Sequence, residues 1–149
     1  QGVGETCRLP KTAWPPTSIF LIGARGEADV LLTDVYREAG YEVQVATNDG
    51  SVGTKGFVTV LVEKLLAENA GRKFFFYGCG PHPMLMALAK ILNARNQKGE
   101  LSIDHLMCCG VGACFACVVK VKADTPEGWQ YARACTDGPV FNLDTVYVE

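Results

Sequence analysis

Three closely spaced cysteines in a glycine-rich segment constrain this chain more than any other sequence feature. Cys109, Cys114 and Cys117 follow the spacing C-x4-C-x2-C, and Cys135 lies further along the chain. This is the spacing with which plant-type 2Fe–2S proteins bind their cluster, the distant cysteine being the fourth ligand. We therefore expect these four cysteines to bind a 2Fe–2S cluster, whose common role is to transfer single electrons.

The residues between the cysteines suit a loop that wraps closely around such a cluster. Small side chains let the backbone approach the cluster and direct N–H groups at its sulfur atoms. Glycine also accepts the unusual backbone angles that this wrapping requires. The small residues of the segment are Gly110, Gly112, Ala113 and Ala116. After the third cysteine, residues 118–122 are predicted to form a strand, and residues 131–135 lead to the fourth ligand.

Other uses of the cysteines fit the sequence less well. A structural zinc site usually has two closely spaced pairs, whereas only Cys114 and Cys117 form such a pair here. Disulfides are disfavoured because the count of seven cysteines is odd and no apolar signal segment is recognised. A zinc-stabilised module without redox activity stays open as an alternative. So does a C-x5-C spacing that starts at Cys108, although Cys109 is preferred as the ligand.

Length, composition and charge limit the partners of the chain. Its 149 residues suffice for one ordinary domain or a medium domain with a small appendage. A hydrophobic content of 48% supports a packed core, yet no apolar run has membrane-spanning length. The net charge of −2, with scattered Lys and Arg, gives nucleic-acid binding no electrostatic support. We expect a cytoplasmic protein with reduced cysteines and with neither a membrane nor a nucleic-acid partner.

The hydrophobic pattern predicts an α/β fold in which a parallel, Rossmann-like sheet precedes a small cysteine-rich β domain. Strands are predicted at 19–22, where Gly23 ends the first, at 42–46 and at 74–77. The last is fully apolar, which predicts burial on both faces. Helices are predicted at 29–39, from 57 to a stop at Gly71, and through 84–92. Beyond a polar break at 96–99, short antiparallel strands are expected, including one at 145–148.

Two turns after predicted strands are further candidate sites. In an open parallel sheet, ligands bind at the carboxyl ends of the strands. At the turn 78–83, Gly78 and Gly80 leave room for a flat cofactor ring, and the following helix offers unpaired N–H groups. A tight turn with a buried Cys79 is an equally good interpretation. The glycine-rich segment 50–56 lacks the G-x4-G-K-[ST] order, so a turn that caps the next helix is preferred to a phosphate site.

Several motifs in a fixed order resemble a known family. They are Gly23-Ala24-Arg25, the segments 49–51 and 53–56, Cys79-Gly80-Pro81-x-Pro83-Met84, the cysteine segment 109–117, and Cys135-x-Asp137-Gly138-Pro139-Val140-Phe141. Together they are similar to the electron-transfer subunit of the NAD-dependent, class 1B dihydroorotate dehydrogenases, in the ferredoxin–NADP reductase superfamily. The resemblance covers nearly the whole chain beyond Ser18, and its cysteine segment is the most specific part.

The resemblance implies a domain organisation. Members of the family have a β-barrel that binds FAD, then an NAD-binding sheet, then a 2Fe–2S domain. By this comparison residues 18–98 are expected to form the NAD-binding domain and residues 99–149 the cluster domain. Residues 1–17 would be an N-terminal segment or linker, and the chain is expected to be a fragment without the barrel.

The resemblance also implies a function in pyrimidine biosynthesis. Electrons would pass between NAD(H), FAD, the cluster and the FMN of a separate dihydroorotate dehydrogenase catalytic subunit, which Val111 and Phe115 would contact. The nicotinamide and flavin rings would be bordered by Gly78, Cys79, Gly80 and Pro81. The adenosine half of NAD would lie near Gly23, Ala24 and Arg25. No catalytic residue is assigned, because the cofactors carry the chemistry. The alternative is a related NAD(P)-linked subunit of a sulfide dehydrogenase, transhydrogenase or hydrogenase complex.

Overall fold

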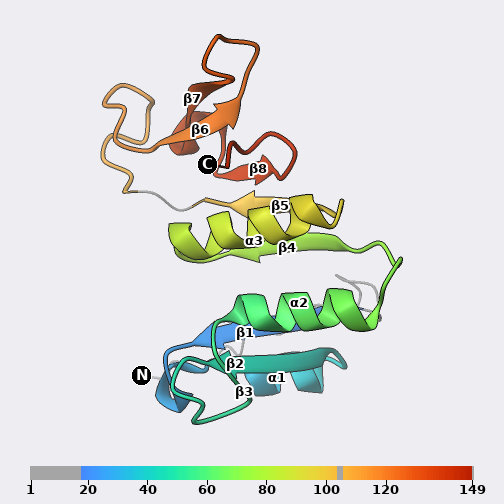
Figure 1. The fold of residues 1–149 in the computed structure, drawn as a ribbon. Helices are drawn as coiled ribbons and strands as arrows, with labels where there is room; N and C mark the ends of the chain where they lie inside the picture. The colour runs from blue at the N-terminus through green and yellow to red at the C-terminus, as the bar shows by residue number, and fades with distance from the viewer. Residues whose placement is uncertain (1–17, 104–105, 149) are drawn as a thin grey trace, which may run out of the picture. The chain divides into compact units, whose positions relative to one another are not determined.

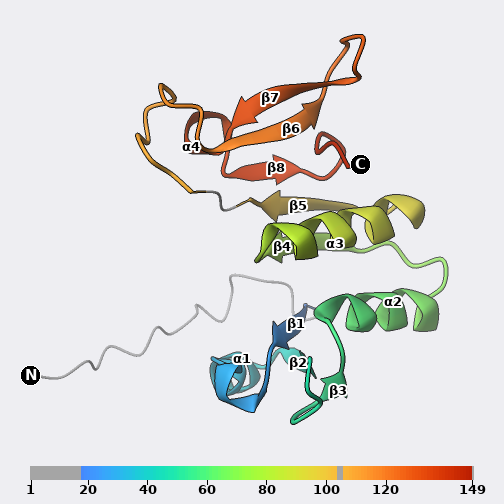
Figure 2. The ribbon, with the colours of Figure 1, turned by 60° about the vertical axis from the view of Figure 1, so that its left-hand side comes forward.

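The computed structural model describes residues 18–103 and 106–148 and confirms the predicted α/β class (Figures 1 and 2). The chain divides into two compact units between Glu68 and Asn69. The described part of the first unit is residues 18–68, and that of the second is residues 69–103 and 106–148. The predicted division at residue 98, which separates the chain by cofactor, stays a prediction.

The first unit is built on a parallel sheet. Its strands lie in the order β1-β2-β3, namely β1 (Ile19–Ala24), β2 (Glu42–Thr47) and β3 (Thr54–Lys55). The helices of this unit are the short 3₁₀ helix η1 (Glu27–Asp29), α1 (Thr33–Glu38) and α2 (Val58–Glu68).

Helices cover both faces of this sheet (Figures 1 and 2). Phe20 of β1 stacks on Tyr36 of α1, with ring centroids 4.1 Å apart. A Cβ atom on Gly23 of the same strand would lie 2.8 Å from the Cβ of Val58 in α2. Because residues 20 and 23 of a strand point to opposite faces, α1 and α2 lie on opposite sides of β1. Gly23 thus permits close packing of α2 on the sheet.

Two predicted boundaries in the first unit are wrong. The strand predicted to end before Gly23 continues to Ala24, because Gly23 and Ala24 both have pairing partners in β2. The helix predicted at 29–39 is limited to 33–38, because Leu32 adopts the left-handed φ of 62° that a continuous helix cannot contain. By contrast, the predicted helix α2 is confirmed, and its buried residues are Leu61, Val62, Leu65 and Leu66.

The second unit combines a mixed sheet with a hairpin. The parallel strands β4 (Phe75–Cys79) and β5 (Lys98–Ser102) are joined by helix α3 (His82–Ala94), and β8 (Val140–Asn142) pairs antiparallel with β5. An antiparallel hairpin consists of β6 (Val118–Lys122) and β7 (Trp129–Arg133), and the short helix α4 (Ala134–Asp137) follows it directly. The core is apolar, with fully buried Leu85, Leu92, Leu101, Ile103, Leu143 and Val146.

The second unit corrects two further expectations. Strand β4 is not buried on both faces, since Phe75 and Tyr77 are 52% and 61% exposed. Only its other face packs against helix α3. The strand predicted at 145–148 is reduced to an isolated bridge between Val121 and Val146. In the described part of the chain, every helix is too short or too polar to cross a membrane.

Two glycines of the first unit have left-handed conformations, but only one of them is packed against the sheet. Gly53 has φ +71°, and a Cβ atom there would overlap the carbonyl oxygen of Val45. Gly40 has φ +90°, but a Cβ atom there meets nothing within 4 Å. We expect Gly40→Ala to lower the free energy of unfolding by about 1 kcal/mol, the cost of the left-handed conformation. Gly53→Ala should cost about 3 kcal/mol or more, because the backbone must also move. Equal losses in urea unfolding would contradict this prediction.

Candidate functional site

The loop with three of the predicted ligands is held in an unusual backbone conformation. Residues 106–117, here called the cysteine loop, precede β6 and contain neither helix nor strand. Within it Gly110 and Gly112 have φ values of +68° and +77°, and the non-glycine residue Phe115 has φ +59°. Such left-handed positions reverse the direction of the chain within a few residues. The loop therefore curls back on itself around Cys109, the first predicted ligand.

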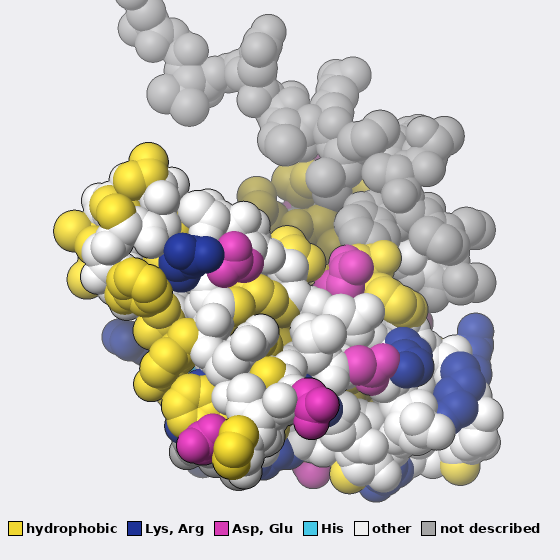
Figure 3. Space-filling model, turned by 90° about the horizontal axis from the view of Figure 1, so that it is seen from above, with side chains coloured by type: hydrophobic (Ala, Val, Ile, Leu, Met, Phe, Trp, Pro, Cys, Tyr) yellow, Lys and Arg dark blue, Asp and Glu magenta, His cyan; other side chains and the backbone are white. Residues whose placement is uncertain are grey.

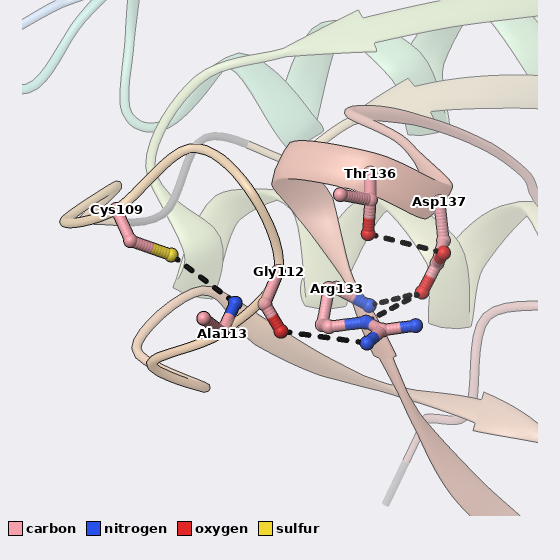
Figure 4. Close-up of polar contacts among 6 residues, drawn as sticks. All are labelled: Cys109, Gly112, Ala113, Arg133, Thr136 and Asp137. Carbon is pink, nitrogen blue, oxygen red and sulfur yellow. Dashed lines mark hydrogen bonds and ion pairs between the residues drawn. The ribbon is translucent and has the colours of Figure 1, made fainter.

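Backbone N–H groups on the inside of this curl are directed at Cys109. The N–H of Ala113 donates to the Cys109 sulfur at 3.3 Å (Figure 4). Hydrogen bonds from the N–H of Val111, and then from the N–H and thiol of Cys114, lower the pKa of Cys109 to about 6. These donors favour the thiolate, which is the form that binds iron. The loop thus directs amides at the sulfur of one predicted ligand, while their donation to the sulfurs of a cluster stays a prediction.

The other two predicted ligands form a second pair. Cys117 is buried and immediately precedes β6, while the half-buried Cys135 is in α4. The backbone N–H and then the thiol of Cys135 donate to the sulfur of Cys117 and lower its pKa. The same thiol contact, followed by burial, raises the pKa of Cys135. A backbone hydrogen bond of 2.9 Å from the N–H of Ala134 to the carbonyl of Cys117 fixes the start of α4 beside this predicted ligand.

The two pairs of cysteines lie close enough for their charges to interact. The charges of Cys117 and Cys109 both add to the raised pKa of Cys135, and the N–H of Gly112 donates to the Cys135 sulfur. The six cysteines that the structure describes are free thiols. No three His, Cys, Asp or Glu side chains of the described residues are gathered closely enough to hold a metal ion. The set of four ligands therefore stays a prediction.

The residues present nevertheless fit a 2Fe–2S cluster in their chemistry. Four thiols are arranged as two contacting pairs, and the loop supplies N–H donors toward sulfur at Cys109. Cys108 and the predicted ligand Cys114 are both exposed, so exposure does not decide between Cys108 and Cys109; the N–H donors of the loop are directed at Cys109. Cys7 and His105 lie outside the described residues. Iron–sulfur clusters require thiolate ligands and N–H donors to sulfur, and the loop offers both.

Sequence reasoning did not find Arg133 as part of this site. Its backbone N–H and Nε both contact Asp137 Oδ2, at 2.8 and 3.4 Å, and its Nη1 donates to the Gly112 carbonyl at 3.4 Å (Figure 4). The contact with the Arg133 N–H is also the main reason that the pKa of Asp137 is lowered. The only hint in the sequence was that an arginine and an aspartate flank Cys135, a predicted ligand.

At the carboxyl ends of β1 and β2, polar bonds join two turns of the first unit. The carbonyl of Arg25 accepts the N–H of Asp49 at 3.2 Å. Ser51 Oγ accepts the N–H of Glu27 at 2.8 Å and donates to Asp49 Oδ1 at 2.7 Å. Hydrogen bonds from the N–H and then the hydroxyl of Ser51 lower the pKa of Asp49. The segment predicted only as a capping turn therefore also fixes the turn that follows Ala24.

Gly78, near the end of β4, has a packing role that its sequence did not reveal. A Cβ atom on Gly78 would lie 2.8 Å from side-chain atoms of both Leu101 and Leu88. The space that was expected to admit a flat ring is thus filled by the core on that side of the strand. Cys79 is exposed rather than buried, which removes the buried-cysteine interpretation. The cofactor contacts predicted for residues 78–81, and for residues 23–25 in the first unit, stay predictions.

Known proteins match both the cysteine loop and the rest of the chain. The sequence model for the iron–sulfur cluster binding domain of dihydroorotate dehydrogenase B matches residues 104–147. The electron transfer subunit of dihydroorotate dehydrogenase B (NAD(+)) from Fusobacterium nucleatum is 43% identical over 132 residues, or 89% of this chain and 48% of the relative. The subunit of the same name from Caldanaerobacter subterraneus is 46% identical over 105 residues, or 70% of this chain and 40% of the relative.

The chain is a homologue of the electron transfer subunits of dihydroorotate dehydrogenase B. It spans about half the length of these curated relatives. The fold agrees as well. A chain from the structure of the NADH-dependent reduced ferredoxin-NADP oxidoreductase superposes with a TM-score of 0.68 at 30% identity, covering 88% of this chain and 44% of that one. The predicted resemblance to this family and superfamily is confirmed.

The amides around Cys109 predict how its reactivity depends on pH. In the metal-free protein, with Cys108→Ser as background, alkylation of Cys109 should be half-maximal at about pH 6. The rate should fall as the pH drops below this value, because the reactive thiolate becomes protonated. Mass spectrometry of the labelled peptide measures the rate. Unfolding should return the midpoint to about 8.5, the value of a free thiol; the same midpoint in the folded protein would show that the loop does not stabilise the thiolate.

Proposed function

We propose that this chain transfers electrons for a NAD-dependent dihydroorotate dehydrogenase of pyrimidine biosynthesis, with a 2Fe–2S cluster bound by Cys109, Cys114, Cys117 and Cys135. One observation carries the proposal. Within the residues that match the cluster-binding domain of the family, backbone N–H groups point at the Cys109 sulfur. When bound, a 2Fe–2S cluster supplies one-electron transfer.

The protein's own residues would hold and orient the cluster. The cysteine loop presents Cys109 already in an environment that favours its thiolate, so little proton affinity opposes metal binding there. Helix α4 brings Cys135 against Cys117. The N–H groups of the loop would donate to cluster sulfurs in the same way as they now donate to Cys109.

Nucleotide binding belongs to the same proposal. We place the adenosine half of NAD(H) near Gly23, Ala24 and Arg25, at the carboxyl end of β1, where the bonded turns give a fixed surface. The residues proposed to border the nicotinamide and flavin rings are Gly78, Cys79, Gly80 and Pro81. FAD and NAD are proposed as cofactors of the full-length subunit, acting in the cytoplasm.

The cysteine loop also carries a surface suited to a protein partner. Its apolar side chains Leu106, Met107, Val111 and Phe115 are exposed, and Figure 3 shows hydrophobic side chains gathered at the left of this face, over the loop. Exposed apolar patches rimmed by polar residues are typical of protein interaction sites. We propose that they contact the FMN-containing catalytic subunit.

A second candidate is a NAD(P)-linked subunit of another redox complex, of the sulfide dehydrogenase, transhydrogenase or hydrogenase type. The structural likeness to a chain of the NADH-dependent reduced ferredoxin-NADP oxidoreductase favours keeping it. The protein that co-purifies with the full-length subunit separates the two candidates. A dihydroorotate-oxidising flavoprotein supports the first, and a partner without that activity supports the second.

Iron and acid-labile sulfide analysis of anaerobically prepared protein tests the cluster directly. About two atoms of each per chain are expected, together with visible absorption that bleaches on reduction. A colourless protein that contains zinc would support the alternative of a non-redox module. The measurement requires no knowledge of the partner.

Single substitutions test the ligand set. Cys114→Ser or Cys135→Ser should abolish the cluster, because each removes a thiolate that the iron requires. Cys7→Ser should leave the iron content unchanged, and so should Cys79→Ser, an exposed cysteine of the second unit outside the predicted set. Iron and sulfide are measured in each variant after identical reconstitution. Full iron content in Cys135→Ser would refute the proposed ligands.

A further inference from the structure

We propose that Arg133 is a positioning residue that fastens the cysteine loop to the segment bearing Cys135, so that the predicted ligands are held in register before metal binds. Only the measurement on cluster-loaded protein, described below, rests on the proposed function. The connection is not implied by the ligand spacing, because Arg133 contributes no sulfur. It follows from four contacts made by one side chain and its own backbone.

One side of Arg133 is anchored beside Cys135. Arg133 is the last residue of β7 and immediately precedes α4. The Asp137 carboxylate accepts its backbone N–H at 2.8 Å and lies 3.4 Å from its Nε. One carboxylate oxygen thus holds both the main chain and the side chain of the arginine. This arrangement orients the guanidinium toward the loop (Figure 4).

The other side of Arg133 contacts the cysteine loop at two points. Its Nη1 donates to the carbonyl of Gly112, which lies between the first and second predicted ligands. Its guanidinium carbon lies 5.8 Å from the ring centroid of Phe115, between the second and third. A cation at this distance from an aromatic ring is attracted to its face. One residue therefore contacts both halves of the loop.

One of the two contacted residues, Phe115, needs support from its surroundings, whereas a positive φ is cheap for Gly112 because it is a glycine. Gly112 has φ +77° and Phe115 has φ +59°, and a non-glycine residue keeps such a conformation only when its surroundings enforce it. Gly112 is also packed closely, since a Cβ atom there would lie 3.2 Å from Thr136 Cγ2 and 3.5 Å from Arg133 Nη1. Arg133 consequently acts where the loop would otherwise relax.

Arginine suits this role better than lysine. Its planar guanidinium presents several N–H donors in a fixed fork, so that it contacts Asp137 and the Gly112 carbonyl together while lying against Phe115. A lysine ammonium has the same charge but is a single point on a flexible stem. Substitution by lysine therefore separates the geometry of the contact from its charge.

The experiment compares the loss of iron from anaerobic, cluster-loaded full-length protein to an excess of chelator. Arg133→Ala and Arg133→Lys should both release iron about tenfold faster than the unsubstituted protein, as expected when a residue supporting a ligand is removed. Arg95→Ala is the matched control, an exposed arginine of the same unit, and should release iron at the original rate. The reduction potential is measured in parallel. Because it responds to charge, Arg133→Lys should keep the original potential while still losing iron quickly.

A metal-free measurement keeps the inference testable by itself. Cys117 is 3% exposed, so it should be alkylated slowly at fixed pH in the metal-free protein. Arg133→Ala should raise this rate severalfold and leave the thermal unfolding temperature close to that of Arg95→Ala. If both Arg133 variants match Arg95→Ala in the release of iron and in the alkylation of Cys117, the inference is overturned. If the protein holds no iron and sulfide but Cys117 is exposed by Arg133→Ala, the cluster proposal fails and the positioning role stands.

Discussion

The candidate site depends on a backbone that must point its N–H groups inward over a few residues. Ordinary strand or helix geometry cannot do this, because each uses its N–H groups for its own hydrogen bonds. The cysteine loop has neither strand nor helix geometry, because Gly110, Gly112 and Phe115 adopt left-handed conformations. Backbone N–H groups of the loop are instead directed at the sulfur of Cys109. Sulfur chemistry at this site is therefore a consequence of backbone conformation as much as of cysteine spacing.

The fold could be predicted only in part, because some elements are determined by their own sequence and others by contacts that form only in the fold. The apolar repeat of α2 was sufficient to predict that helix, because its packing follows its own sequence. The interruption at Leu32 was not visible, since an apolar residue in a left-handed conformation leaves no pattern. Nor could the sequence show that Gly23 and Gly78 admit neighbouring side chains, because Val58 and Leu101 approach them only through the fold.

The candidate site shows a similar division. The spacing of the cysteines and the glycines between them predicted the type of loop, which is a local property of the sequence. The partner of each thiol was not predictable, because the contact of Cys117 with Cys135 depends on where β7 and α4 place the distant residue. The role of Arg133 was not predicted for the same reason, since its contact with Gly112 joins positions 21 residues apart. Non-local contacts of this kind are set by topology rather than by the local pattern.

The distribution of protons over the thiols follows from these contacts and connects the free chain with metal binding. Hydrogen bonds favour the charged form at Cys109 and at Cys117, while the raised pKa of Cys135 favours its thiol, which donates a hydrogen bond to the sulfur of Cys117. A third negative charge at Cys135 would be close to both others, whose charges already raise its pKa. If Cys135 is a metal ligand as proposed, its proton must leave when metal binds, because metal ligation requires a thiolate. The affinity of the proposed site for metal should accordingly increase as the pH rises, and the metal would take the place of the proton between the two sulfurs.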